Sequence, residues 1–136
     1  MLFRSLIKTQ LDFKSDIGMM PQDDLLIKDL TVKELVLLKA YMNKLKDFEV
    51  ESMLSKVELS DKKKNLVNNL SGKQQRRLSL LLLLLNNPRL LFLDEPTTGM
   101  DLASIDNFWK LLKDRSCTSV IVTHDFNQID QFFSRV

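Results

Sequence analysis

Residue types that form covalent cross-links or metal sites are scarce in this chain of 136 residues. Cys117 is the only cysteine, which excludes an internal disulfide and a thiolate metal site and indicates a reducing compartment. Basic residues outnumber acidic ones by only 20 to 18 and are scattered, so the charge does not favour nucleic acid as a partner. The densest basic cluster, residues 62–64, is typical of a solvated surface.

The chain also lacks a hydrophobic run of membrane-spanning length. The leucines at 80–85 are far fewer than the ~20 apolar residues that a spanning helix needs, and Pro88 follows them closely. They therefore predict a buried helix. The first residues lack the apolar core and cleavage site of a signal peptide. With 44% hydrophobic and 28% charged residues, the composition is typical of one soluble globular domain.

The order of the apolar segments predicts an α/β fold with parallel strands. Strand patterns occur within residues 1–22 and at 89–93 and 119–123, and the two later ones have continuous apolar runs at 90–93 and 120–122, as buried parallel strands do. Residues 59–69 are expected to form a connection or a short helix. Helices are predicted from residue 31, at 47–57, after residue 71, at 102–113 and at 125–134.

Three helix starts carry capping signals. Thr31 with Glu34, and Ser71 with Gln74, have the spacing of a capping box, in which each side chain satisfies a free backbone N–H of the first turn. Asp101 stands where it can cap the next helix. After Thr31, apolar residues recur at helical spacing, namely Leu35, Leu38, Met42 and Leu45.

Several short polar motifs interrupt this pattern, and each has an ordinary structural explanation when taken alone. The stretch Ser71-Gly72-Lys73-Gln74 is a helix N-cap, but the free N–H groups of such a helix start can also bind an anion. Two acids end the strand at 89–93, a glycine turn precedes Asp101, and the single histidine follows the last strand. Ligands of open α/β sheets bind at these carboxyl ends.

Taken together and in this order, the motifs resemble those of the ATP-binding cassette (ABC) ATPases. Residues 70–74 (LSGKQ) resemble the signature motif LSGGQ, with Lys73 in place of the family's second glycine. Residues 90–95 resemble the Walker B strand, residues 96–101 the D-loop, and residues 123–125 the H-loop. Gln22, after Pro21, resembles the glutamine of the Q-loop. The resemblance extends over almost the whole chain.

The resemblance implies roles for individual residues. Asp94 is expected to hold Mg²⁺ through water, Glu95 to activate the attacking water, and His124 to contact the γ-phosphate. Gln22 is expected to reach Mg²⁺ and to sense a coupled transmembrane subunit. The remaining candidates contact nucleotide across a dimer of cassettes, and they are Ser71, Gly72, Gln74 and Asp101.

A P-loop is missing from the sequence. That loop requires the pattern G-x-x-x-x-G-K-[ST], whereas Gly72-Lys73 is the only Gly-Lys pair and Gln74 follows it. The expected fold is therefore a partial P-loop NTPase, with core pieces at about 1–22 and 88–136 and a helical subdomain at about 23–87. Because most phosphate contacts are gone, we expect this chain by itself to bind Mg-ATP poorly and to be inactive.

The resemblance implies a subunit, or a fragment of one, that couples ATP hydrolysis to export through an ABC transporter. Its cofactors are ATP and Mg²⁺, and its partners a second cassette and a transmembrane subunit, with no nucleic acid. The expected location is the cytoplasmic face of the membrane. Two alternatives remain open. One is an ABC ATPase without a transport role, acting in translation or on chromosomes, and the other is an inactive remnant that only binds a partner.

Overall fold

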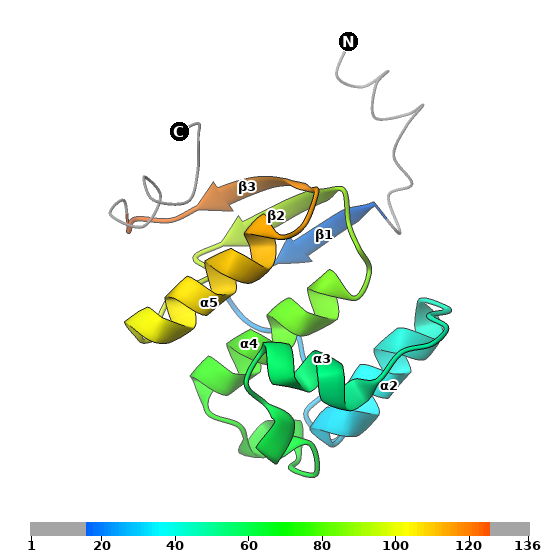
Figure 1. Cartoon of the computed structure of the whole chain (residues 1–136). Helices are drawn as coiled ribbons and strands as arrows, with labels where there is room; N and C mark the ends of the chain where they lie inside the picture. The colour runs from blue at the N-terminus through cyan, green and yellow to red at the C-terminus, as the bar shows by residue number, and fades with distance from the viewer. Residues whose placement is uncertain (1–15, 126–136) are drawn as a thin grey trace.

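The computed structural model describes residues 16–125, which form a small sheet and a set of helices (Figure 1). The predicted strand material before residue 16 and the predicted helix at 125–134 lie outside this range, apart from Asp125. The elements in chain order are β1 (Ile17–Met20), α2 (Val32–Met42), α3 (Val50–Lys56), the 3₁₀ turns η1 (Ser60–Lys62) and η2 (Val67–Asn69), α4 (Gly72–Leu84), β2 (Leu90–Asp94), α5 (Leu102–Lys113) and β3 (Thr118–Val122).

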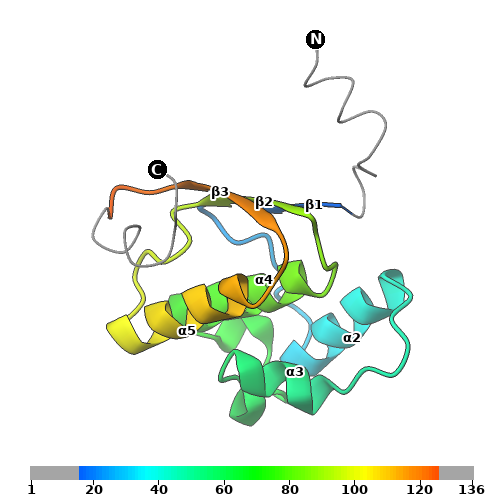
Figure 2. The same cartoon turned by 45° about the horizontal axis from the view of Figure 1, so that its top comes forward.

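The three strands are parallel, in the order β1-β2-β3, which confirms the predicted α/β fold class. Helices α4 and α5 both lie against one face of this sheet (Figure 2). The register pairs Met19 with Phe92 and Phe92 with Val120, and all three side chains are exposed on the opposite face. Because the strands are parallel, their carboxyl ends meet at one edge.

Two hydrophobic clusters hold the described residues together, and α4 contributes to both. Leu78 and Leu81 pack with α2 and α3, whereas Leu80 and Leu84 pack beneath the sheet with α5. A helix that is apolar on opposite sides is buried on both, which explains the leucine run. The division into a core and a helical subdomain at 23–87 stays a prediction, since α4 belongs to both clusters.

The three capping signals are confirmed. Thr31 and Ser71 form complete capping boxes with Glu34 and Gln74, respectively. Asp101 accepts from the Ser104 N–H at the start of α5. These signals are reliable because both partners lie within one helical turn.

The face that α2 turns to the core differs from the one its leucine spacing suggests. Leu38 and Met42 are exposed, and the helix instead buries Val32, Val36 and Ala40 alongside Leu35. Backbone bonds at the first turn, from Val32 N to the Asn65 carbonyl and from Lys33 N to the Lys63 carbonyl, dock the helix against a distant segment. This tertiary contact sets the rotation of the helix, and helical spacing alone carries no information about it.

Two smaller predictions also need correction. Helix α3 begins at Val50 rather than at residue 47, because Asp47 has a left-handed φ of 54° that a helix cannot include. Strands β2 and β3 each lie one residue away from their predicted positions. Within residues 16–125, no helix combines the length and the apolar character needed to cross a membrane.

Candidate functional site

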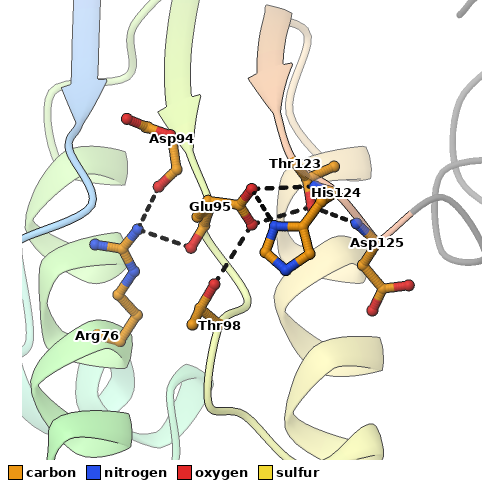
Figure 3. A network of polar contacts seen from close by, with 7 residues as sticks. All are labelled: Arg76, Asp94, Glu95, Thr98, Thr123, His124 and Asp125. Carbon is orange, nitrogen blue, oxygen red and sulfur yellow. Dashed lines mark hydrogen bonds and ion pairs between the residues drawn. The ribbon is translucent and has the colours of Figure 1, made fainter.

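The carboxyl edge of the sheet brings together the candidates that the sequence placed after its strands. Gln22 lies two residues after β1, Asp94 is the last residue of β2, and His124 lies two residues after β3. Figure 3 shows Asp94, Glu95 and His124 with their polar neighbours at this edge. This is the part of an open α/β sheet where ligands bind.

Glu95 has an unusual backbone conformation. Its φ is 45°, in the left-handed region that residues other than glycine enter rarely and at some cost. Its N–H donates to the Val122 carbonyl over 2.7 Å, which continues the contact between β2 and β3 by one residue. The turn at this point aims the Glu95 carboxylate toward the end of β3, whereas the carboxylate of Asp94 points the other way (Figure 3).

The Glu95 carboxylate is held by several donors. Oε1 accepts from the His124 backbone N–H at 3.0 Å and lies 2.7 Å from the Nδ1 atom of its ring. Oε2 accepts from the hydroxyls of Thr123 at 3.3 Å and Thr98 at 3.4 Å. Burial acts to raise the pKa of Glu95, but the bonds from His124 and Thr123 outweigh it and lower the pKa overall. At neutral pH the group is therefore an ionised carboxylate that can accept a proton.

The side chain of His124 is exposed to solvent. Its side chain is 84% exposed, and the ring contacts Glu95 through Nδ1. Figure 3 shows the rest of the ring directed away from Glu95, where it can reach a molecule bound above the sheet edge. A carboxylate that fixes one ring nitrogen orients the other for hydrogen bonding.

Asp94 and Gln22 offer oxygen ligands of the kind that Mg²⁺ prefers. Both are exposed, and their main-chain carbonyls contact the same guanidinium group, that of Arg76. Among the described residues, no three His, Cys, Asp or Glu side chains cluster closely enough to hold a metal by themselves. One carboxylate and one amide suit Mg²⁺, because this ion commonly keeps several waters and takes its other ligands from substrate phosphates.

The signature-like residues form a separate group at the start of α4. The Ser71 hydroxyl accepts from Gln74 N at 3.2 Å, and the Gln74 side chain accepts from Ser71 N at 3.0 Å. Gly72 has no neighbouring atom within 4 Å of the position where a Cβ would lie, so its surroundings are open. This group begins at Ser71, five residues before Arg76 in the chain. It presents the N-terminal end of a 13-residue helix to solvent.

Asp101 serves a structural purpose in this chain. Its Oδ2 accepts from Ser104 N at 3.3 Å and its Oδ1 from the Ser104 hydroxyl at 2.9 Å. These two bonds lower the pKa of Asp101. The capping role is therefore confirmed, and a contact of Asp101 with a nucleotide stays a prediction.

The sequence did not single out Arg76, which has the most extensive polar contacts of the site. Its side chain is only 6% exposed, and its guanidinium contacts the loops after both β1 and β2. One signal could have found it: Arg76 stands four residues before Leu80 and eight before Leu84, on a buried face of α4. A charge on a buried helical face is rare unless it is paired.

The parallel sheet and its helices define an α/β protein, and the carboxyl edge with its acids and histidine is the candidate ligand site. The sequence profile of the ABC transporter family matches residues 4–98. This chain belongs to the ABC transporter family.

Named relatives and a solved structure agree with this membership. The chain is 37% identical over 99 residues to the high-affinity zinc uptake system ATP-binding protein ZnuC of Bacillus subtilis, covering 70% of this chain and 43% of that protein. It is 36% identical over 132 residues to the cholesterol transporter ABCA5 of Rattus norvegicus, covering 93% of this chain and 8% of that protein. The chain thus spans less than half the length of these relatives.

The fold is also that of a solved protein. A structure described as the ATP binding subunit of an ABC transporter superposes with a TM-score of 0.78, over 88% of this chain and 53% of that one. The sequences are 20% identical in this superposition, so it shows the shared fold.

Proposed function

We propose that this chain is part of the ATP-binding subunit of an ABC transporter and that Glu95 is its general base for ATP hydrolysis. The observation that carries the proposal is the Glu95 carboxylate, ionised and held by His124 and Thr123 at the carboxyl edge of the sheet. A general base must be unprotonated and fixed within reach of the proton that it accepts. Glu95 meets the first requirement through its lowered pKa and the second through its donors.

The neighbouring residues have complementary roles in this proposal. Asp94 and Gln22 hold Mg²⁺, which neutralises charge on the ATP phosphates when bound. His124 orients Glu95 through Nδ1 and presents its free ring face to the γ-phosphate. Ser71, Gly72 and Gln74 serve a second nucleotide, at the interface with another cassette, because the start of α4 is open and carries the positive end of the helix dipole.

The phosphate-binding loop of this site must come from residues outside the 136, since the sequence contains no P-loop pattern. The partners are then a second cassette and a transmembrane subunit, and the location is the cytoplasmic face of the membrane. Export stays a prediction from the sequence. One named relative is an uptake protein and another a cholesterol transporter, and neither name fixes the direction for this chain.

The test combines the full chain with a separately expressed cassette fragment that carries a P-loop. Hydrolysis of Mg-ATP is expected only when both are present, and Glu95→Gln should lower it by about 10²- to 10⁴-fold. Arg77→Gln is the matched control, because Arg77 pairs with Glu58 away from the sheet edge. Hydrolysis that stays at the wild-type rate in Glu95→Gln contradicts the proposed role of Glu95. A complex that forms but never hydrolyses ATP supports the binding-only alternative, and copurification with ribosomes or DNA supports a role outside transport.

A further inference from the structure

Arg76 is a buried charged residue between two loops that carry proposed site residues. It projects from the second turn of α4, and its side chain is 6% exposed. The adjacent Arg77 provides a contrast, because it points to another side of the helix and contacts Glu58 and the Val57 carbonyl. Two neighbouring arginines on one helix therefore have separate partners.

The first set of contacts holds the loop after β1. Nη1 of Arg76 donates to the Pro21 carbonyl at 2.5 Å, to the Gln22 carbonyl at 3.2 Å and to Asp24 Oδ1 at 3.0 Å. Asp24 is itself only 14% exposed, so this is a buried ion pair. These bonds fix the backbone from which the Gln22 side chain extends.

The second set of contacts holds the loop after β2. Nη2 donates to the Asp94 carbonyl at 2.7 Å and to the Glu95 carbonyl at 3.1 Å, and Nε donates to the Pro96 carbonyl at 3.2 Å. Figure 3 shows the Arg76 guanidinium beside the carbonyls of Asp94 and Glu95, on the side opposite to His124. The three carbonyls surround the residue with the left-handed φ, so the guanidinium holds Glu95 in its strained conformation.

We propose that Arg76 is a positioning residue for ATP hydrolysis: one guanidinium fixes the loops of Gln22 and Glu95 relative to each other and to α4. The proposal rests on the function proposed above and extends it. Five main-chain carbonyls and one carboxylate are more acceptors than an ammonium group can contact, since lysine has three donors at one point and arginine five in a fork. Arginine is therefore specifically required at this position.

The arrangement also links two sites. The start of α4 holds Ser71, proposed to face the nucleotide of a second cassette, and Arg76 lies on the next turn of the same helix. A shift of α4 is therefore transmitted to the carbonyls of Asp94 and Glu95 through short, charge-assisted hydrogen bonds.

The first experiment needs no hydrolysis and uses amide NMR spectra of the full chain. Asp24→Asn weakens the contact of Arg76 with the first loop only, yet we expect it to shift the Glu95 and Thr97 amides in the second loop. Arg76→Lys should shift the amides of both loops, and Arg77→Gln should shift neither. Changes after Asp24→Asn that stay confined to residues 22–25 would overturn the linkage of the two loops.

The second experiment measures hydrolysis by the full chain assembled with the P-loop fragment. Arg76→Lys is expected to lower kcat by about 10²-fold, as small misplacements of catalytic groups do, with KM for ATP unchanged. Adding Arg76→Lys to Glu95→Gln should cause a much smaller further loss than Arg76→Lys causes alone, because the part of its effect that acts through Glu95 is already gone. A rise in KM at constant kcat, or additive losses in the double variant, would contradict the positioning role.

The two experiments separate the possible failures. If the assembled wild-type protein never hydrolyses ATP while Asp24→Asn still perturbs the Glu95 amide, the proposed function fails and the linkage of the loops stands. If Arg76→Lys loses its folded spectrum, Asp24→Asn supplies the result, because it leaves the guanidinium and its carbonyl contacts in place.

Discussion

The Glu95–His124 pair and the Arg76 guanidinium contact the same short loop, but they differ in exposure and in how far along the chain their partners lie. The histidine side chain is 84% exposed and the glutamate 16%, and their contacts come from residues at the ends of adjacent strands. The arginine is 6% exposed and contacts residues up to 55 positions away in the chain. The difference indicates that the proposed site keeps an accessible histidine and a partly exposed glutamate, while the geometry of their loop depends on a buried group from another element.

The largest expected effect is on ATP hydrolysis and comes from changing Glu95, in the Glu95–His124 pair. Glu95→Gln removes the proposed base but keeps the size of the side chain, and we expect ATP hydrolysis by the chain assembled with a P-loop fragment to fall by about 10²- to 10⁴-fold. The free energy of unfolding should change little, since the amide of glutamine keeps an oxygen that can accept from the His124 N–H. Steady-state hydrolysis and urea unfolding of the same preparation measure the loss of activity and the change in stability, respectively. A large loss of stability would mean that Glu95 has a structural rather than a reactive role.

The next largest effect is on the free energy of unfolding and comes from changing the buried residue Arg76. Arg76→Met removes the charge and leaves Asp24 and the carbonyls of two loops without their donor, which should lower the free energy of unfolding by about 3 kcal/mol or more. Urea unfolding of the 136-residue chain measures this. The control is Arg77→Met, whose partner Glu58 is 56% exposed, so the expected loss is below about 1 kcal/mol. Equal losses for the two arginines would remove the distinction between them.

Local signals explain what the sequence predicted well. The capping residues, the bounds of α5 and the parallel strands follow from neighbours within one turn or from periodic apolar residues. Asp94, Glu95 and His124 were placed at one edge for the same reason, since each follows a strand and parallel strands end together.

The remaining features depend on contacts between distant segments. The rotation of α2 is set by backbone bonds to residues 63 and 65, and the role of Arg76 by acceptors that lie 18 to 55 positions away. A leucine run likewise shows that a helix is buried, but not that its two sides contact different clusters. These facts become visible only when the segments are placed in space.

A smaller effect compares the two capping boxes. Ser71→Ala and Thr31→Ala should each lower the free energy of unfolding by about 1 kcal/mol, because each removes one side-chain acceptor from a helix start. Only Ser71→Ala should also reduce hydrolysis in a pair of cassettes, since only Ser71 belongs to the proposed nucleotide contact. Urea unfolding curves measure the loss of stability in each variant, and ATP hydrolysis by the pair of cassettes measures the loss of activity. An equal effect of both variants on hydrolysis would reduce Ser71 to a capping residue.

The smallest expected effect concerns the pH dependence of stability and the exposed residue Asp101. The pKa of Asp101 is lower in the folded chain because Ser104 donates to its carboxylate, so its contribution to stability is complete above its ordinary pKa and is lost as the pH falls through the folded pKa. Asp101→Asn should therefore be slightly destabilising at neutral pH and indistinguishable from the wild type in acid. Thermal unfolding of Asp101→Asn and of the wild type, from neutral to acidic pH, measures this pH dependence. A loss of stability in Asp101→Asn that is constant with pH would show that the carboxylate charge of Asp101 does not contribute to stability.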